Sequence, residues 1–243
     1  KNAVHDSKMA DLMISGSKYR TQSFRTSFWY NGEILECGTP KSDIFYMPKD
    51  KYRKFIRKEL GLDSNVKIAL YVPTFRKDGN LNCYNIDYDR LIEALENNLS
   101  GSWKIVVRLH PNIGNKNKLL SYSNCVINGT DYESANELIV ASDLIITDYS
   151  GCMFQGLESD IPVVLYTVDI EEYNKDRGMY FSLDDLPFPY ARNNDELIHL
   201  IENWQAHSYS KCADDFKKKL GFFNSSNSTE KVVREVMKRI GQN

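Results

Sequence analysis

The chain has 243 residues, of which 42% are hydrophobic and 26% charged, the composition of an ordinary globular protein with a full core. A formal net charge of -2 gives no broad basic surface, so we expect no nucleic-acid partner. Five scattered cysteines without C-x-x-C spacing argue against a disulfide framework and a zinc site, and no apolar run reaches the ~20 residues of a membrane span.

Residues 1–46 show a strand, helix, strand pattern, with strands expected at 11–15 and 34–37 and a helix at 18–29. One β-α-β unit of this size cannot bury a core alone. We therefore expect this segment to be the tail of a preceding amino-terminal domain, in a chain cut from a longer protein. The charged residues 47–65 are expected to form a linker helix.

From residue 66 to 243, strands and helices alternate, which predicts an α/β fold: a Rossmann-like parallel sheet with helices on both faces, in one nucleotide-donor-binding domain. The expected strands are 66–72, 103–109, 125–127, 144–147 and 163–166. The expected helices are 88–98, 116–122, 134–141, 152–158, 195–205, 209–220 and 229–240, the last capped by the polar loop 224–228. Ligands of such sheets bind beyond the carboxyl ends of the strands, so the residues that follow strands are the site candidates.

Polar turns follow the first two of these strands. The first strand runs into Pro73-Thr-Phe-Arg76, where the planar guanidinium suits phosphate oxygens, although a solvated loop arginine is about as common. The second runs into Arg108-Leu-His-Pro111. Pro111 disfavours helix at His110 and holds it extended, so that the imidazole can bind a phosphate or transfer a proton. The alternative is a histidine that only closes the strand end through a backbone carbonyl.

The fourth strand runs into Thr147-Asp-Tyr-Ser-Gly151 and then into a helix. The first amides of that helix lack intrahelical partners, so they and the Ser150 hydroxyl can hold an anionic oxygen, and Gly151 permits close approach. The alternative is that Ser150 only caps the helix. Asp148 is placed to ligate a metal or to orient His110, but an aspartate in such a turn more commonly accepts backbone amides.

Other candidates carry weaker signals. Arg177, after the acidic and tyrosine-rich residues 169–176, is in reach of a second phosphate, although a surface ion pair is its commoner role. Asp87 and Asp89 have the D-x-D spacing of a metal-diphosphate site, but acidic residues before a helix also favour its dipole, so we expect no metal. The chain has no G-x-G-x-x-G, P-loop or G-x-S-x-G motif, which argues against a dehydrogenase, a P-loop phosphotransferase and a nucleophilic Ser150.

Four segments in order, 71–76, 108–111, 143–150 and 161–166, resemble the CDP-glycerol glycerophosphotransferase family, the teichoic acid polymerases and primases. The resemblance extends over residues 10–240, and Gly38-Thr-Pro-Lys-Ser-Asp43 and Arg177-Gly-Met-Tyr-Phe181 look like further landmarks. It implies a GT-B glycosyltransferase architecture of two facing Rossmann-like domains, with this chain as the carboxyl-terminal half that holds the CDP part of the donor.

The resemblance also implies a reaction, the transfer of glycerol phosphate or a related polyol phosphate from a CDP-linked donor to a hydroxyl of a lipid-linked or polymer acceptor. It would proceed in the cytoplasm at the inner face of the cell membrane, with peripheral membrane association and without a metal or cofactor. His110 would be the catalytic residue that contacts the donor diphosphate. The expected donor-binding residues are Arg76, Pro111, Thr147, Asp148, Ser150, Gly151, Gln155 and Arg177.

The chain departs from the family pattern at three points. Gly151 replaces a second serine, Gln155 replaces an acidic residue, and the His-Gly-Thr-Pro motif with the proposed base is absent. We therefore expect this polypeptide to bind donor without turning it over, in the absence of the amino-terminal domain. Two alternatives stay open: a GT-B nucleotide-sugar glycosyltransferase for a surface polysaccharide, which Gly151 and Gln155 favour, and a catalytically silent binding domain.

Overall fold

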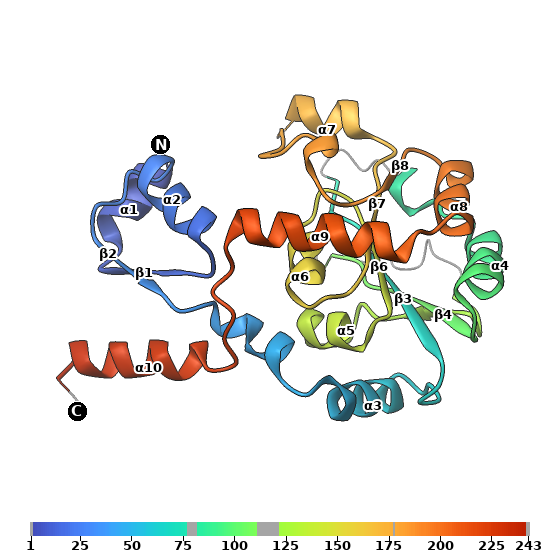
Figure 1. Cartoon of the computed structure of the whole chain (residues 1–243), viewed down its shortest axis with the longest axis horizontal. Helices are drawn as coiled ribbons and strands as arrows, with labels where there is room; N and C mark the ends of the chain where they lie inside the picture. The colour runs from blue at the N-terminus through green and yellow to red at the C-terminus, as the bar shows by residue number, and fades with distance from the viewer. Residues whose placement is uncertain (1, 77–81, 111–121, 177, 242–243) are drawn as a thin grey trace. The chain divides into compact units, whose positions relative to one another are not determined.

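The structure is a computed structural model that describes residues 2–76, 82–110, 122–176 and 178–241. It divides into two compact units, one made of Lys1–Pro48 with Asp214–Asn243 and the other of Lys49–Ala213 (Figure 1). The division expected from sequence differs in two respects. The helix expected as a linker belongs to the larger unit, and the end of the chain, expected in the sheet domain, belongs to the smaller one.

The larger unit is built on a six-stranded parallel sheet with the strand order β5-β4-β3-β6-β7-β8. Its strands are β3 (Lys67–Val72), β4 (Trp103–Val107), β5 (Val126–Asn128), β6 (Leu144–Thr147), β7 (Val163–Tyr166) and β8 (Tyr190–Ala191). The predicted fold class, a Rossmann-like parallel sheet with helices on both faces, is confirmed. Strand β8 was not predicted, since two residues are too few to show a pattern.

Helices cover both faces of this sheet because alternate strand residues point to opposite sides. Helices α4 (Tyr88–Leu99) and α8 (Asn194–Glu202) pack on the face that carries Ala69 and Tyr71 (Figure 1). Helices α5 (Ala135–Ala141) and α6 (Cys152–Glu158) cover the other face. Helix α6 approaches so closely that a Cβ added to Gly156 would lie 2.5 Å from Val163 Cγ2.

Helix α3 (Lys49–Glu59) is fixed to the sheet by an aspartate. Asp143, directly before β6, accepts hydrogen bonds from Arg53, from Arg57 Nη2 at 2.7 Å and from the Ile68 amide at 2.9 Å. Ile56 on the same helix is fully buried. The expected linker is therefore a covering helix of the sheet unit.

The larger unit also contains η2 (Asn82–Tyr84), α7 (Ile170–Asp176) and η4 (Leu183–Asp185), while α9 (Ala206–Leu220) begins in it and ends in the smaller unit. The helix expected at 116–122 lies almost wholly outside the described residues. Asp87 is the N-cap of α4 and accepts the Arg90 amide at 3.2 Å, as its place before a helix indicated. None of the helices described is both long enough and apolar enough to cross a membrane.

The smaller unit contains the predicted β-α-β segment, formed by β1 (Leu12–Ser15), α2 (Lys18–Thr26) and β2 (Glu33–Glu36), with β1 and β2 paired in parallel. Its other elements are α1 (Asn2–Met9), η1 (Pro40–Tyr46) and α10 (Ser228–Arg239).

Helix α10 is capped by a carboxylate far away in the sequence. Asp43 accepts hydrogen bonds from the Ser228 and Thr229 amides, each at 2.8 Å, and Ser228 Oγ donates to the Cys37 carbonyl at 3.0 Å. Gly38 has φ 90°, and a Cβ there would lie 2.4 Å from Ser228 Oγ. The prediction that the loop 224–228 caps this helix was wrong, because the side chain of Asn227 at the cap position makes no bond to the helix amides, and Asp43 supplies the cap instead.

The Asp43 cap leads to a pH-dependent prediction. Burial raises the pKa of Asp43, but the hydrogen bonds from Thr229 and Ser228 outweigh it and hold this pKa below its usual value. The stabilisation is therefore present above the unfolded pKa of about 3.9 and is lost as the pH falls through the folded pKa. Asp43→Ala is expected to destabilise the smaller unit by about 1–2 kcal/mol at neutral pH, and by progressively less in acid.

Urea unfolding of both proteins at pH 7 and in acid measures this difference. The exposed Asp11, replaced by alanine in the same unit, is the control. A loss of stability that is the same at both pH values would contradict the charged cap.

Candidate functional site

The strand order reverses between β3 and β6. Strand β3 pairs with β4 on one side and with β6 on the other, and Val72 lies opposite Thr147 at the carboxyl ends of β3 and β6. The turns 73–76 and 148–151 therefore leave the sheet side by side. This reversal is the topological switch point, where open α/β sheets bind their ligands.

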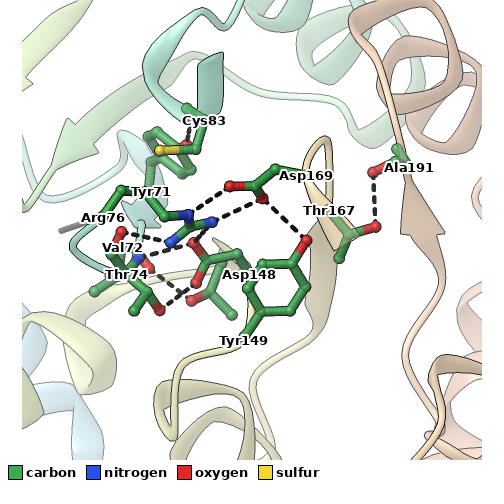
Figure 2. Close-up of polar contacts among 11 residues, drawn as sticks. Tyr71, Val72, Thr74, Arg76, Cys83, Asp148, Tyr149, Thr167, Asp169 and Ala191 are labelled. Carbon is green, nitrogen blue, oxygen red and sulfur yellow. Dashed lines mark hydrogen bonds and ion pairs between the residues drawn. The ribbon is translucent and has the colours of Figure 1, made fainter. Parts of the chain in front are cut away.

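A buried ion-pair cluster, formed by Arg76, Asp148 and Asp169, occupies this point (Figure 2). Asp148, 1% exposed, accepts hydrogen bonds from the Thr74 amide at 2.8 Å, Thr74 Oγ1 at 2.5 Å and Arg76 Nη2 at 2.9 Å. Asp169, after β7, accepts from Arg76 Nε at 2.5 Å and Nη2 at 3.0 Å, and from Tyr149 Oη at 3.0 Å. The cluster thus ties together the chain segments that follow β3, β6 and β7.

The pKa directions show how the charges in the cluster are shared. Burial raises the pKa of Asp148, and Arg76 and Thr74 offset only part of this effect. Burial also acts to raise the pKa of Asp169, but the bonds from Arg76 and Tyr149 outweigh it and lower this pKa. Burial acts to lower the pKa of Arg76, and the two carboxylates more than reverse that. Asp169 is therefore the main counter-charge of Arg76.

Three residues expected in the donor pocket, Arg76, Thr147 and Asp148, bind protein groups in this structure. Arg76 is buried and donates to both carboxylates and to the Thr74 carbonyl at 2.7 Å, so its charge is already neutralised by protein groups. Thr147 is fully buried, and its hydroxyl donates to the Val72 carbonyl at 2.6 Å. Asp148 also accepts protein donors on both oxygens, as the turn interpretation of this residue expected.

The turn at Ser150 and Gly151 is more open. Ser150 is half-buried, and its Oγ accepts the Cys152 amide at 3.3 Å from one residue before the N-cap position, Gly151. Gly151 is exposed, and a Cβ placed on it would meet no atom within 4 Å. Its φ of -56° does not require glycine either. Gln155, one turn further along α6, is half-buried and donates to Asn136 Oδ1 at 2.9 Å.

His110 is exposed beyond the end of β4, as predicted from its place before Pro111. Its ring centroid lies 6.0 Å from that of Phe75, so the turns after β3 and β4 are neighbours. The Leu109 amide donates to Thr130 Oγ1 at 3.1 Å and fixes the backbone next to His110. Pro111 and Arg177 lie outside the described residues.

Four residues near the switch point had been given no role from sequence. Arg108, directly after β4, donates to three backbone carbonyls of residues 129–133. Asp169 follows β7, and Tyr149 stacks on Tyr173 of α7 with ring centroids 3.9 Å apart. The signal for Arg108 and Asp169 was their position just after a strand. Among the described residues, no group of three His, Cys, Asp or Glu side chains is placed to hold a metal ion.

Comparison with known proteins gives consistent matches. Residues 1–238 match the family CDP-Glycerol:Poly(glycerophosphate) glycerophosphotransferase. The teichoic acid poly(glycerol phosphate) polymerase of Bacillus spizizenii (strain W23) is 26% identical over 242 residues, which are 98% of this chain and 61% of that protein. The polymerase of the same name from Staphylococcus epidermidis (strain RP62A) is 33% identical over 196 residues, 78% of this chain and 27% of that protein.

Solved structures agree with these matches. The wall teichoic acid polymerase TagF superposes with a TM-score of 0.82 at 28% identity, over 99% of this chain and 60% of that chain. A variant of TagF soaked with CDPG gives a TM-score of 0.81 at 29% identity, over 99% of this chain and 59% of that chain. The chain thus spans 61% and 27% of the length of the two curated relatives above.

Proposed function

Because the chain belongs to the CDP-glycerol:poly(glycerophosphate) glycerophosphotransferase family, we propose that it is the donor-binding part of a transferase in teichoic acid synthesis. The enzyme would move glycerol phosphate, or a related polyol phosphate, from a CDP-linked donor to an acceptor hydroxyl. The observation that carries this proposal is the family match over residues 1–238. The CDPG-soaked relative supports a CDP-linked donor.

The chemistry places demands on the donor site. The acceptor oxygen forms a bond to the phosphorus of the glycerol phosphate group, the bond from that phosphorus to the CMP oxygen breaks, and the hydroxyl proton leaves to a base. Negative charge grows on the departing CMP. Hydrogen-bond donors fixed around the diphosphate stabilise that charge in the transition state.

In this proposal His110 donates to the donor diphosphate from the rim beyond β4. The Ser150 hydroxyl and the Gly151 backbone contact phosphate oxygens, and the open space over Gly151 suits close approach of a ligand. Gln155 lies one helical turn beyond Gly151, while Pro111 and Arg177 stay donor-binding candidates on the basis of the sequence. The buried cluster of Arg76, Asp148 and Asp169 fixes the turn 148–151 through the hydrogen bonds of Asp148 and Tyr149.

The remaining parts of the proposal concern the whole protein. An amino-terminal domain would face the sheet unit and supply the base. The acceptor would be a lipid-linked or polymer hydroxyl, reached by peripheral association with the cytoplasmic face of the membrane. The relatives, which are longer than this chain, support the presence of further domains.

Calorimetric titration with CDP-glycerol, CDP-ribitol, CDP and a UDP-sugar tests the donor. We expect the CDP compounds to bind and the UDP-sugar to bind at least ten times more weakly. Preference for the UDP-sugar would instead support the nucleotide-sugar glycosyltransferase, which the neutral pair of Gln155 and Asn136 favours. A lack of binding to all four compounds would reject both and leave the silent binding domain.

A further inference from the structure

Two arginines follow the neighbouring strands β3 and β4, but their charges are compensated differently. Arg76 is paired with Asp148 and Asp169. Arg108 donates to the Gly129 carbonyl at 3.2 Å, to the Tyr132 carbonyl and to the Glu133 carbonyl at 3.3 Å. Its partners in the described part of the chain are carbonyls only, without a carboxylate. Arg108 therefore keeps its full positive charge at the edge of the sheet where the site lies.

The contacts of Arg108 also fix the orientation of its guanidinium. The group has five N–H donors in one plane. Two of the three carbonyls are bound by Nη1 and the third by Nη2. Among the described residues, the Nε–H and one Nη2–H have no hydrogen-bond partner, and the Nε–H shares one edge of the plane with an Nη2–H. Such an edge forms a fork that matches two oxygens of a phosphate.

Arg108 lies beside the proposed donor site. It stands two residues before His110, and Cys152, which begins α6 after the turn at Ser150 and Gly151, lies within electrostatic range of the guanidinium. Arg108 is half-buried, and burial lowers the pKa of its guanidinium. A cation that has lost part of its hydration attracts an anion more strongly than an exposed one, because water screens it less.

We propose that Arg108 binds the donor diphosphate as a phosphate-binding cation of the site, the role that the sequence suggested for Arg76. This inference rests on the proposed function. The carbonyls of residues 129–133 hold the guanidinium in position before the ligand arrives, so little side-chain freedom is lost on binding. The simpler alternative is that Arg108 only fastens the loop after β5 to the end of β4.

The test is the affinity of Arg108→Gln for CDP, measured by calorimetry at several NaCl concentrations. We expect the affinity to fall about 10- to 100-fold, as for loss of hydrogen bonds to a charged group. The dependence of log Kd on log salt should also become shallower, because one cation no longer meets the phosphates. The control Arg192→Gln removes the same charge from an exposed arginine after β8 and should bind CDP like the wild type.

Each outcome decides between the alternatives. Wild-type affinity in Arg108→Gln, or weaker binding with an unchanged salt dependence, would overturn the inference and leave the proposed function standing. If the wild-type protein itself does not bind CDP, the proposed function fails and the inference with it. If Arg108→Gln does not fold, Arg108→Lys is measured in its place, because lysine keeps the charge but lacks the two-pronged guanidinium. CDP binding by Arg108→Lys equal to that of the wild type would overturn the inference.

Discussion

Replacing Arg76 with alanine is expected to destabilise the sheet unit by about 3–5 kcal/mol, because it leaves buried carboxyl groups without their cation. Asp148 and Asp169 are 1% and 5% exposed, and both accept hydrogen bonds from Arg76. Urea unfolding followed by circular dichroism measures the change in the free energy of unfolding.

The exposed pair of Arg90 with Asp195 is a matched control for this experiment. The two side chains are 50% and 84% exposed and lie 2.8 Å apart, so water screens their attraction. Arg90→Ala should leave the unfolding midpoint unchanged. Adding Asp148→Asn and Asp169→Asn to Arg76→Ala should restore part of the lost stability, since the uncompensated charges disappear. An Arg76→Ala protein as stable as the wild type would contradict the structural role of the cluster.

Replacing His110 with alanine is expected to have the opposite profile, a large loss of function with little loss of stability. His110 is exposed at the rim, so its removal opens no cavity in the core. In the complete transferase we expect the rate of CMP release from CDP-glycerol to fall about 10²- to 10³-fold, as for loss of one donor that stabilises transition-state charge. Selective binding of CDP should also be lost.

The matched control for this variant is His207→Ala, which removes another exposed histidine, on α9. It should keep both the rate and the unfolding midpoint of the wild type. Retention of CDP binding and of the rate in His110→Ala would remove His110 from the site. A large drop in its unfolding midpoint would show instead that the ring is needed for the fold.

The sequence predicted the positions of the strands, helices and polar turns better than it predicted which side chains pair with one another. Strands β6 and β7 and helix α6 have the predicted bounds, because each is a compact apolar run between clear polar flanks. The sequence also predicted that the polar turns after β3 and β6 lie at one edge of the sheet, since the carboxyl ends of parallel strands meet wherever the alternation of strands and helices holds.

The roles of individual side chains could not be predicted from the sequence in the same way. Arg76 finds its main partner, Asp169, 93 residues away in the chain, and no local pattern encodes that pair. The carbonyl partners of Arg108 lie 21 to 25 residues away and carry no side-chain signature at all. Thr147 shows the same limit, because a threonine at a strand end can face a ligand or a neighbouring carbonyl.

The cap of α10 by Asp43 has a consequence for how the protein is made. The two segments that form the smaller unit lie on either side of the larger one in the sequence. The larger unit can fold as soon as residue 213 has left the ribosome, since domains generally fold as units during synthesis. The smaller unit must wait until residues 228 and 229 emerge, because only then can Asp43 bind their amides. Residues 1–48 thus lack the segment that completes their unit for as long as the whole of the larger unit is being synthesised.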